Sequence, residues 1–164
     1  MLLPSANDAA MVIADNYPGG VSAFVAKMNE KAATYHLANT QFVDPTGLDA
    51  KDTTTVTDMA RLAAIAIQNL ILKEVTGTKE KIITDLTGNS YYLNNLNKLL
   101  GSNGVTGLKT GTTEEAGEVL VTSVTIDNHP YIIVVMNSKD RFADTTALIS
   151  FIRQNVQFVM PRLP

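Results

Sequence analysis

The chain has 164 residues, of which 45% are hydrophobic and 18% are charged, and this composition indicates one globular domain with a hydrophobic core. Its formal net charge is −3 and its isoelectric point is about 5.3, so it lacks the basic excess that nucleic-acid binding requires, and no nucleic-acid partner is expected. The absence of cysteine excludes disulfides, thiolate chemistry and cysteine-ligated zinc. No apolar run reaches the roughly 18 residues of a membrane-spanning helix.

The first part of the chain is predicted to be mainly helical. Apolar residues at helical spacing predict one helix over residues 5–17 and a second over about 21–36. Residues 37–55 are predicted to form a loop, because they contain proline, glycine and a run of threonines. A third helix is expected to run from an N-cap at Thr57-Asp58 to about residue 73.

A small β-ribbon is predicted next, because residues 79–85 alternate in polarity and residues 87–89 form a turn. Residues 94–100 are expected to form a short helix or a turn. The pattern that follows predicts three strands, over residues 105–110, 119–126 and 131–137. A hairpin turn at residues 127–130 would join the last two strands.

A closing helix is predicted to open at Asp144. Its apolar stripe would be formed by Leu148, Ile152, Val156 and Val159. This order of elements is an α+β pattern, with helices packed on an antiparallel sheet. Since three strands make a thin sheet, one face or edge is expected to lack a partner.

Two short motifs are candidates for chemistry. Ser5-Ala6-Asn7 lies where the first helix is expected to begin, and Lys109-Thr110-Gly111 lies at the end of a predicted strand. They are 104 residues apart (109 − 5), so only the fold could bring them together. Each also has a structural interpretation, since the segment from Ser5 to Asp8 fits a helix capping box and K-T-G fits a strand that ends in a turn.

The patterns S-x-N and K-T-G occur together with S-x-x-K in serine acyl-transferases that recognise penicillin. In such a site the S-x-N serine lies between two lysines and relays a proton, and the asparagine amide holds a substrate carbonyl. Ser5, Asn7 and Lys109 are therefore candidate catalytic residues. Gly111 would let the substrate dock as an extra strand, and the backbone N–H of Thr112 would form half of an oxyanion hole.

The surroundings of both motifs resemble the serine-type D-alanyl-D-alanine carboxypeptidases, the low-molecular-mass penicillin-binding proteins. Residues 2–10, Leu-Leu-Pro-Ser-Ala-Asn-Asp-Ala-Ala, are similar to that family's second motif block nearly residue for residue. Further segments follow in the family's order: residues 44–49, 57–60, 95–100, 107–117, and Arg141 with Asp144-Thr145. The resemblance implies a β-lactamase/transpeptidase-like fold, with residues 1–164 as a partial penicillin-binding domain.

The resemblance also implies a function. Members of the family remove the terminal D-Ala from peptidoglycan stem peptides through an acyl-serine intermediate and are acylated by penicillins. The sequence contains no cofactor motif, so no cofactor is expected. Lys109, Thr110 and Arg141 would bind the terminal carboxylate of a stem peptide ending in D-Ala-D-Ala, or that of a β-lactam, as their charges favour. An extracytoplasmic place in the cell envelope is expected, with any export signal or anchor outside this chain.

The sequence departs from the family in two places. No serine is followed by a lysine three residues later, so the nucleophile of S-x-x-K is not in this chain. The family's first strands and nucleophile helix would lie in the same missing segment, so we expect an incomplete fold, a dimer or swapped partner over the sheet, and no activity from the chain alone. Glu118 and Val119 stand where the family more often has an aromatic or small residue and then Cys or Asn.

Other functions remain as alternatives. A non-catalytic peptidoglycan-binding or regulatory relative that has lost the nucleophile would bind ligand without turnover. A β-lactamase would need a water-activating glutamate, and the absence of an E-x-x-L-N block argues against it. His36 and His129 have no ligand cluster around them in the sequence, so no metal site is expected.

Overall fold

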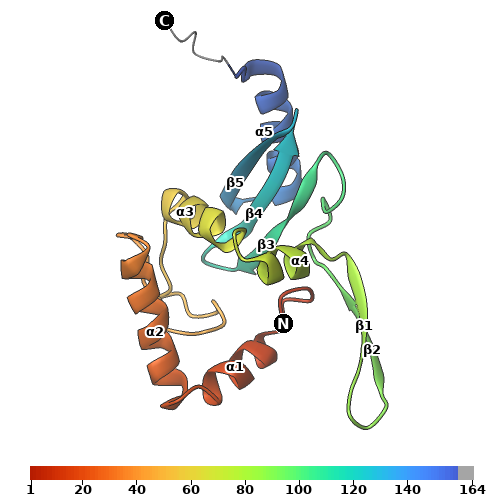
Figure 1. The fold of residues 1–164 in the computed structure, drawn as a ribbon. Helices are drawn as coiled ribbons and strands as arrows, with labels where there is room; N and C mark the ends of the chain where they lie inside the picture. Colours follow the sequence, from red (N-terminus) through yellow and green to blue (C-terminus); the bar gives the residue numbers. More distant parts are fainter. Residues whose placement is uncertain (159–164) are drawn as a thin grey trace, which may run out of the picture.

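The fold is organised around one antiparallel sheet (Figure 1). The computed structural model describes residues 1–158. The sheet has the order β3-β4-β5, with β3 (Val105–Thr113), β4 (Gly117–Ile126) and β5 (His129–Ser138). The three predicted strands are confirmed. The hairpin turn between β4 and β5 is shorter than predicted, because Asp127 and Asn128 form it with φ values of 49° and 65°.

Helices cover both faces of this sheet. α5 (Arg141–Asn155) packs on one face, and α3 (Val56–Ala66) and α4 (Leu70–Gly77) pack on the other. Because both faces are covered, the five residues 120–124 of β4 are all buried, whereas a half-exposed strand would alternate. The predicted α+β architecture, with helices on an antiparallel sheet, is confirmed.

Two apolar clusters hold these layers together. The larger lies between the sheet and α5 and consists of Leu100, Val105, Val124, Ile126, Ile133, Val135 and Ile149. The smaller lies between the sheet and α3 and consists of Ala63, Leu108 and Val121. Leu108 directly precedes Lys109 in β3, so the second cluster fixes the strand at the K-T-G motif.

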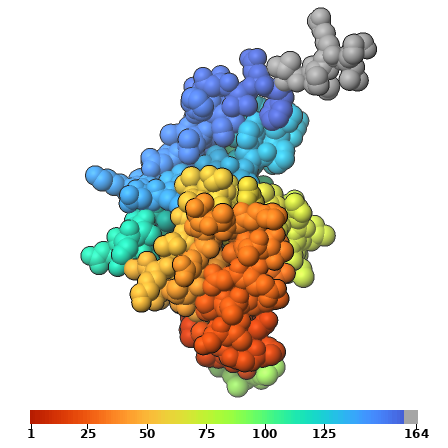
Figure 2. All heavy atoms as spheres, turned by 90° about the vertical axis from the view of Figure 1, so that its left-hand side faces the viewer, coloured from red at the N-terminus to blue at the C-terminus, as the bar shows by residue number. Residues whose placement is uncertain are grey.

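The first two helices form an arm beside the sheet (Figures 1 and 2). α1 (Asn7–Asp15) and α2 (Gly20–Thr34) pack on each other, and Tyr17 meets Phe24 in a T-shaped arrangement with ring centroids 5.5 Å apart. Val12 on α1 is 60% exposed. The apolar spacing therefore predicted the helix correctly, but the apolar face that it predicted is not buried within residues 1–158.

The segment between α2 and α3 is a loop, as predicted, and helix side chains hold it in place. Asp58 of α3 is buried, and its Oδ2 accepts hydrogen bonds from the Asn39 N–H at 2.8 Å and the Thr40 hydroxyl at 2.9 Å. Asn29 of α2 exchanges two hydrogen bonds with the backbone of Phe42, at 2.7 and 2.8 Å. The Asp58 and Asn29 side chains form hydrogen bonds with backbone groups of the loop that have no partner in a helix or sheet. These bonds fix the conformation of the loop.

The prediction of one helix over residues 57–73 is wrong. α3 ends at Ala66, and the Asn69 side chain accepts hydrogen bonds from two N–H groups of the next turn, at 3.0 and 3.1 Å, which starts α4. The start was also misplaced, because Thr55 is the N-cap of α3 and its hydroxyl accepts from the N–H of Asp58 at 3.2 Å.

The closing helix begins three residues earlier than predicted. Asp140 is its N-cap, and its carboxylate accepts from the N–H groups of Phe142 and Ala143 at 3.1 and 2.9 Å. Asp144 therefore lies inside the first turn, where its negative charge suits the helix N-terminus.

The buried face of α5 also differs from the predicted stripe. Ile149 is fully buried and Ile152 packs beside it, whereas Leu148 is 41% exposed. Val156 follows the last helical residue, and Val159 lies outside the described residues.

β1 (Glu80–Thr84) and β2 (Ser90–Asn94) form the predicted ribbon, which projects from the rest of the chain (Figure 1). Asp85 orders its turn by accepting from the N–H groups of Thr87 and Asn89, both at 2.9 Å. Residues 95–100 form a turn, one of the two predicted alternatives. No helix within residues 1–158 combines the length and hydrophobicity needed to cross a bilayer.

Replacing Asn69 by alanine is expected to lower the free energy of unfolding by about 1 kcal/mol, because α4 loses the side chain that satisfies two of its first N–H groups. The adjacent Gln68→Ala variant is the control, since Gln68 is not the cap. Urea unfolding followed by circular dichroism measures both. An N69A protein as stable as the wild type would contradict the role of Asn69 as the start of α4.

Candidate active site

Lys109 connects the start of the chain with the sheet. It lies in β3 directly after the buried Leu108, and its Nζ donates to Ser5 Oγ at 2.6 Å and to the Thr110 carbonyl oxygen at 2.7 Å. The two sequence motifs are therefore in direct contact, although 104 residues separate them. A hydroxyl bonded to a lysine ammonium can take part in proton transfer with it.

Ser5 does not cap α1, so the capping-box interpretation is wrong. The N-cap is Ala6, which makes no side-chain cap hydrogen bond, and the first-turn N–H of Ala9 is accepted by the carboxylate of Asp8 at 2.7 Å, not by Ser5. Ser5 has a φ of 55°, in the left-handed region that is uncommon for residues with a side chain, and its hydroxyl is engaged with Lys109. Asn7 is the half-buried first residue of α1, and no hydrogen bond joins its amide to β3 within residues 1–158.

Arg141 reaches the other end of the K-T-G motif from the start of α5. Its Nη1 donates to the Gly111 carbonyl oxygen at 2.6 Å and to the Thr112 hydroxyl. The ring of Phe142 lies beneath the guanidinium, with 5.1 Å between Cζ and the ring centroid. Arg141 is thus held against β3 and does not extend into solvent.

Lys109 and Arg141 form a positive region without an acidic partner. The only salt bridge within residues 1–158 joins Lys27 to Glu30, so no carboxylate of the described chain lies within 4.0 Å of either cationic group. Burial lowers the pKa of Lys109, and the positive charge of Arg141 lowers it further. Two cations beside hydroxyl and backbone groups are suited to an anionic ligand group such as a carboxylate.

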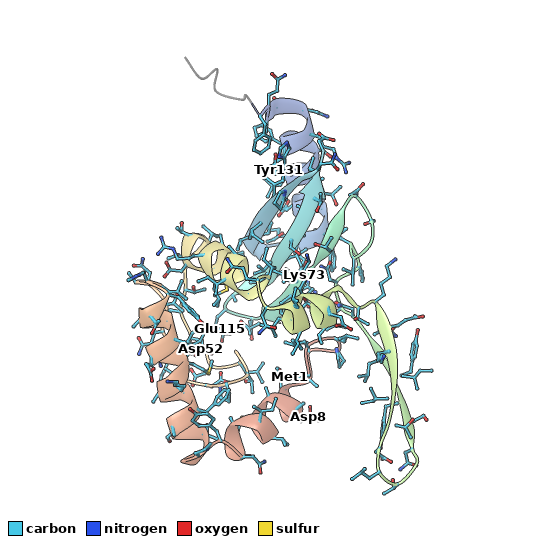
Figure 3. All side chains as sticks on the ribbon, in the orientation of Figure 1. Met1, Asp8, Asp52, Lys73, Glu115 and Tyr131 are labelled. Atoms are coloured by element: carbon cyan, nitrogen blue, oxygen red, sulfur yellow. The ribbon has the colours of Figure 1, made fainter. Side chains whose placement is uncertain are left out.

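A pocket of about 530 Å³ borders the same strand. It is lined by Asp52, Thr53, Thr54, Met59, Lys109, Thr110, Gly111, Glu115, Ala116, Val119, Val121, Met136 and Asn137. Asp52 from the loop and Glu115 from the β3–β4 turn lie close together (Figure 3), and both line this pocket. A volume of this size can hold part of a peptide. Residues 1–158 contain no group of three or more histidine or acidic side chains arranged to hold a metal ion.

Six of the seven candidate residues converge on the K-T-G strand: Ser5, Lys109, Thr110, Gly111, Thr112 and Arg141. Asn7 follows Ser5 without such a contact. One further residue joins the site, because Glu118 accepts a hydrogen bond from the backbone N–H of Arg141 at 2.9 Å. In the sequence, Glu118 stood out only because it departs from the family pattern. Its contact with Arg141 could be recognised only from the pairing of the strands in the structure.

Comparison with known proteins gives the family. The family model described as D-alanyl-D-alanine carboxypeptidase, Peptidase_S11, matches residues 1–140. The chain belongs to this family. A D-alanyl-D-alanine endopeptidase of Pseudomonas aeruginosa is 37% identical over 153 residues, which are 90% of this chain and 49% of that relative. The chain spans about half the length of the curated relatives that it matches first.

Solved structures of the D-alanyl-D-alanine peptidase fold are also similar. The Streptomyces K15 DD-transpeptidase matches with a TM-score of 0.85 and 31% identity, over 92% of this chain and 63% of that one. Penicillin-binding protein D2 of Listeria monocytogenes, in its cefotaxime-bound form, matches with a TM-score of 0.79 and 32% identity, over 92% and 62%. The predicted transpeptidase-like fold and the family resemblance are confirmed.

Replacing Arg141 by alanine is expected to raise the pKa of Lys109, because a neighbouring positive charge disfavours the protonated ammonium. The pKa should stay below that of an exposed lysine, about 10.4, since burial is the larger cause of the lowering. NMR titration of the Lys109 side chain measures the change. Arg61→Ala is the control, because that guanidinium binds the His36 carbonyl oxygen. An unchanged pKa in R141A would contradict the charge coupling.

Proposed function

We propose that this chain carries the substrate-binding part of a serine D-alanyl-D-alanine carboxypeptidase. The whole enzyme would remove the terminal D-Ala from peptidoglycan stem peptides through an acyl-serine intermediate, and penicillins would acylate it. The observation that carries the proposal is the contact of 2.6 Å between Lys109 Nζ and Ser5 Oγ, which joins the S-x-N and K-T-G motifs. Membership of the family supports the same activity.

Lys109, Thr110 and Arg141 are proposed to bind the terminal carboxylate of a D-Ala-D-Ala peptide or of a β-lactam. The two cations have no acidic partner within residues 1–158, and both contact the backbone of the same strand. A ligand carboxylate would supply the missing negative charge through charge-assisted hydrogen bonds. The cefotaxime-bound relative is a penicillin-binding protein, which supports β-lactams as a ligand class.

Gly111 supports a peptide that docks along β3. A Cβ at this position would meet only the Val119 Cβ, at an ordinary 3.8 Å, so nothing inside the described protein requires glycine there. β3 is an edge strand of the sheet. A peptide that adds at this edge would come close to Gly111, and the backbone N–H of Thr112 is proposed to donate to the oxyanion that forms during acyl transfer.

Ser5 and Asn7 are proposed to act on the leaving group and on substrate orientation. With Ser5 bonded to Lys109, a proton held on the lysine can pass through the hydroxyl to the leaving amine of D-Ala. The lowered pKa of Lys109 makes that transfer easier near neutral pH. The Asn7 amide would hold a carbonyl of the bound peptide.

The nucleophile is not among these residues, since no serine has the S-x-x-K spacing. The chain alone is therefore proposed to bind substrate without turning it over. A non-catalytic peptidoglycan-binding or regulatory role is the alternative. The name of the Pseudomonas relative favours a second substrate as well, a cross-linked peptide that an endopeptidase would cut. By family likeness, we propose that the protein works outside the cytoplasm, in the cell envelope.

The 164-residue chain is expected to bind N-acetyl-D-Ala-D-Ala and to release no D-Ala. Gly111→Ala should weaken binding by about tenfold or more without lowering Tm, because the new methyl group meets the ligand and not the protein. NMR titration measures binding, and an assay for released D-Ala measures turnover. Release that Lys109→Ala abolishes would overturn the predicted inactivity. Binding that is equal in wild type, G111A and R141A would refute the site.

β5 has an unpaired outer edge within residues 1–158, and such an edge favours pairing with another strand. We propose that a swapped element or a dimer partner covers the sheet when this chain occurs alone. Sedimentation should then show self-association that increases with concentration. A strictly monomeric sample that unfolds in one cooperative thermal transition would count against this partner.

A further inference from the structure

Glu118 lies where three parts of the site meet. In the register of the sheet it stands opposite Thr112 of β3 and opposite Ser138 of β5. The sheet has a β-bulge here. The paired residues Glu118 and Leu120 are two positions apart on β4, whereas their partners Ser138 and Val135 are three positions apart on β5. Glu118 thus stands between the K-T-G strand and the end of the strand that leads into α5.

The carboxylate of Glu118 completes the N-terminus of α5. The first four N–H groups of a helix have no partner within the helix. Asp140 accepts from the second and third N–H groups through its carboxylate, and from the fourth through its carbonyl oxygen at 3.0 Å. The first N–H belongs to Arg141, and Glu118 Oε2 accepts it at 2.9 Å. An acceptor from another strand therefore fixes the backbone of Arg141.

The side chain of Arg141 is fixed to the residue that faces Glu118. Its Nη1 donates to the Gly111 carbonyl oxygen and to the hydroxyl of Thr112, which pairs with Glu118 across β3 and β4. Glu118 and the guanidinium do not form a salt bridge within 4.0 Å. Glu118 therefore holds Arg141 by its backbone and leaves the positive charge of its side chain available.

We propose that Glu118 is a positioning residue that sets Arg141 against the K-T-G strand and so gives the site its selectivity for ligands with a free terminal carboxylate. This inference rests on the proposed function, in which Arg141 binds that carboxylate. Hydrogen bonds between a guanidinium and a carboxylate depend strongly on geometry, so a displaced helix start would weaken them. If Glu118 only stabilised the start of α5, replacing it would lower the stability of the protein and leave this selectivity unchanged.

The test compares N-acetyl-D-Ala-D-Ala with its C-terminal amide, using the full-length product of the gene that encodes this chain. The readout is Kd, or KM where the peptide is turned over. The wild type should prefer the acid by about tenfold or more, and Glu118→Ala should reduce that preference about fivefold through weaker binding of the acid alone. Glu118→Gln keeps an acceptor oxygen and should stay within about twofold of the wild type.

Two further variants give the experiment its controls. Glu114→Gln changes an exposed acidic residue of the β3–β4 turn, four residues before Glu118, and should leave the acid preference as it is. In the Arg141→Ala background, Glu118→Ala should change the remaining preference by less than about twofold, because its partner is gone. Hydrogen exchange at the Arg141 amide should be faster in Glu118→Ala and near wild type in Glu118→Gln.

The outcomes separate this inference from the proposed function. An acid preference that survives Glu118→Ala, or an equal loss for acid and amide, would overturn the role of Glu118. A wild type without acid preference, or a preference that Arg141→Ala does not reduce, would refute the proposed function and the inference with it. Where Glu118→Ala unfolds, Glu118→Asp takes its place, since its carboxylate is one methylene group shorter and is expected to hold the same N–H less well, and the same criteria apply.

Discussion

A hydrogen bond of 2.6 Å between Lys109 Nζ and Ser5 Oγ joins the start of the chain to the K-T-G strand and so brings the two motifs of the site together. A lysine that leaves water needs hydrogen-bond acceptors to offset its lost hydration. Lys109 finds them in the Ser5 hydroxyl and the Thr110 carbonyl oxygen. Because Leu108 is fixed in the cluster under α3, the lysine has a rigid base, and Ser5 is brought to it.

The same strand organises the positive charge. Lys109 and Arg141 come from different elements, yet both donate to carbonyl oxygens of the K-T-G motif. Neither meets a carboxylate within 4.0 Å in residues 1–158, although Asp52 and Glu115 line the same pocket as Lys109. The arrangement keeps the cations close together at the cost of a lowered lysine pKa, and an anionic ligand would relieve that repulsion.

Much of the fold could be predicted because its determinants are local. The strands were recognisable from apolar, β-branched runs such as the one in β4, which both layers of helices bury. The break before α4 was missed because apolar spacing continues across it, and only the Asn69 cap shows where one helix stops. The start of α5 was misplaced because Asp140 and Asp144 are both good residues for a helix N-terminus, and sequence does not rank them.

The residues of the site could be predicted from the sequence, but the contacts between them could not. Ser5 fits a helix cap in the sequence, and only its distant contact with Lys109 shows that its hydroxyl is used elsewhere. Glu118 stood out only as a departure from the family. Its partner lies 23 residues away, on the next helix, and sheet register is needed to bring them together.

A crystal structure of the full-length protein with a bound D-Ala-D-Ala peptide tests the central claim most directly. We expect the peptide to lie along β3 with its terminal carboxylate within about 3.2 Å of the Lys109 or Arg141 side chain, close to the Ser5–Lys109 hydrogen bond. A peptide bound elsewhere, such as in the apolar groove between Phe24 and Phe42, with β3 empty, would contradict it.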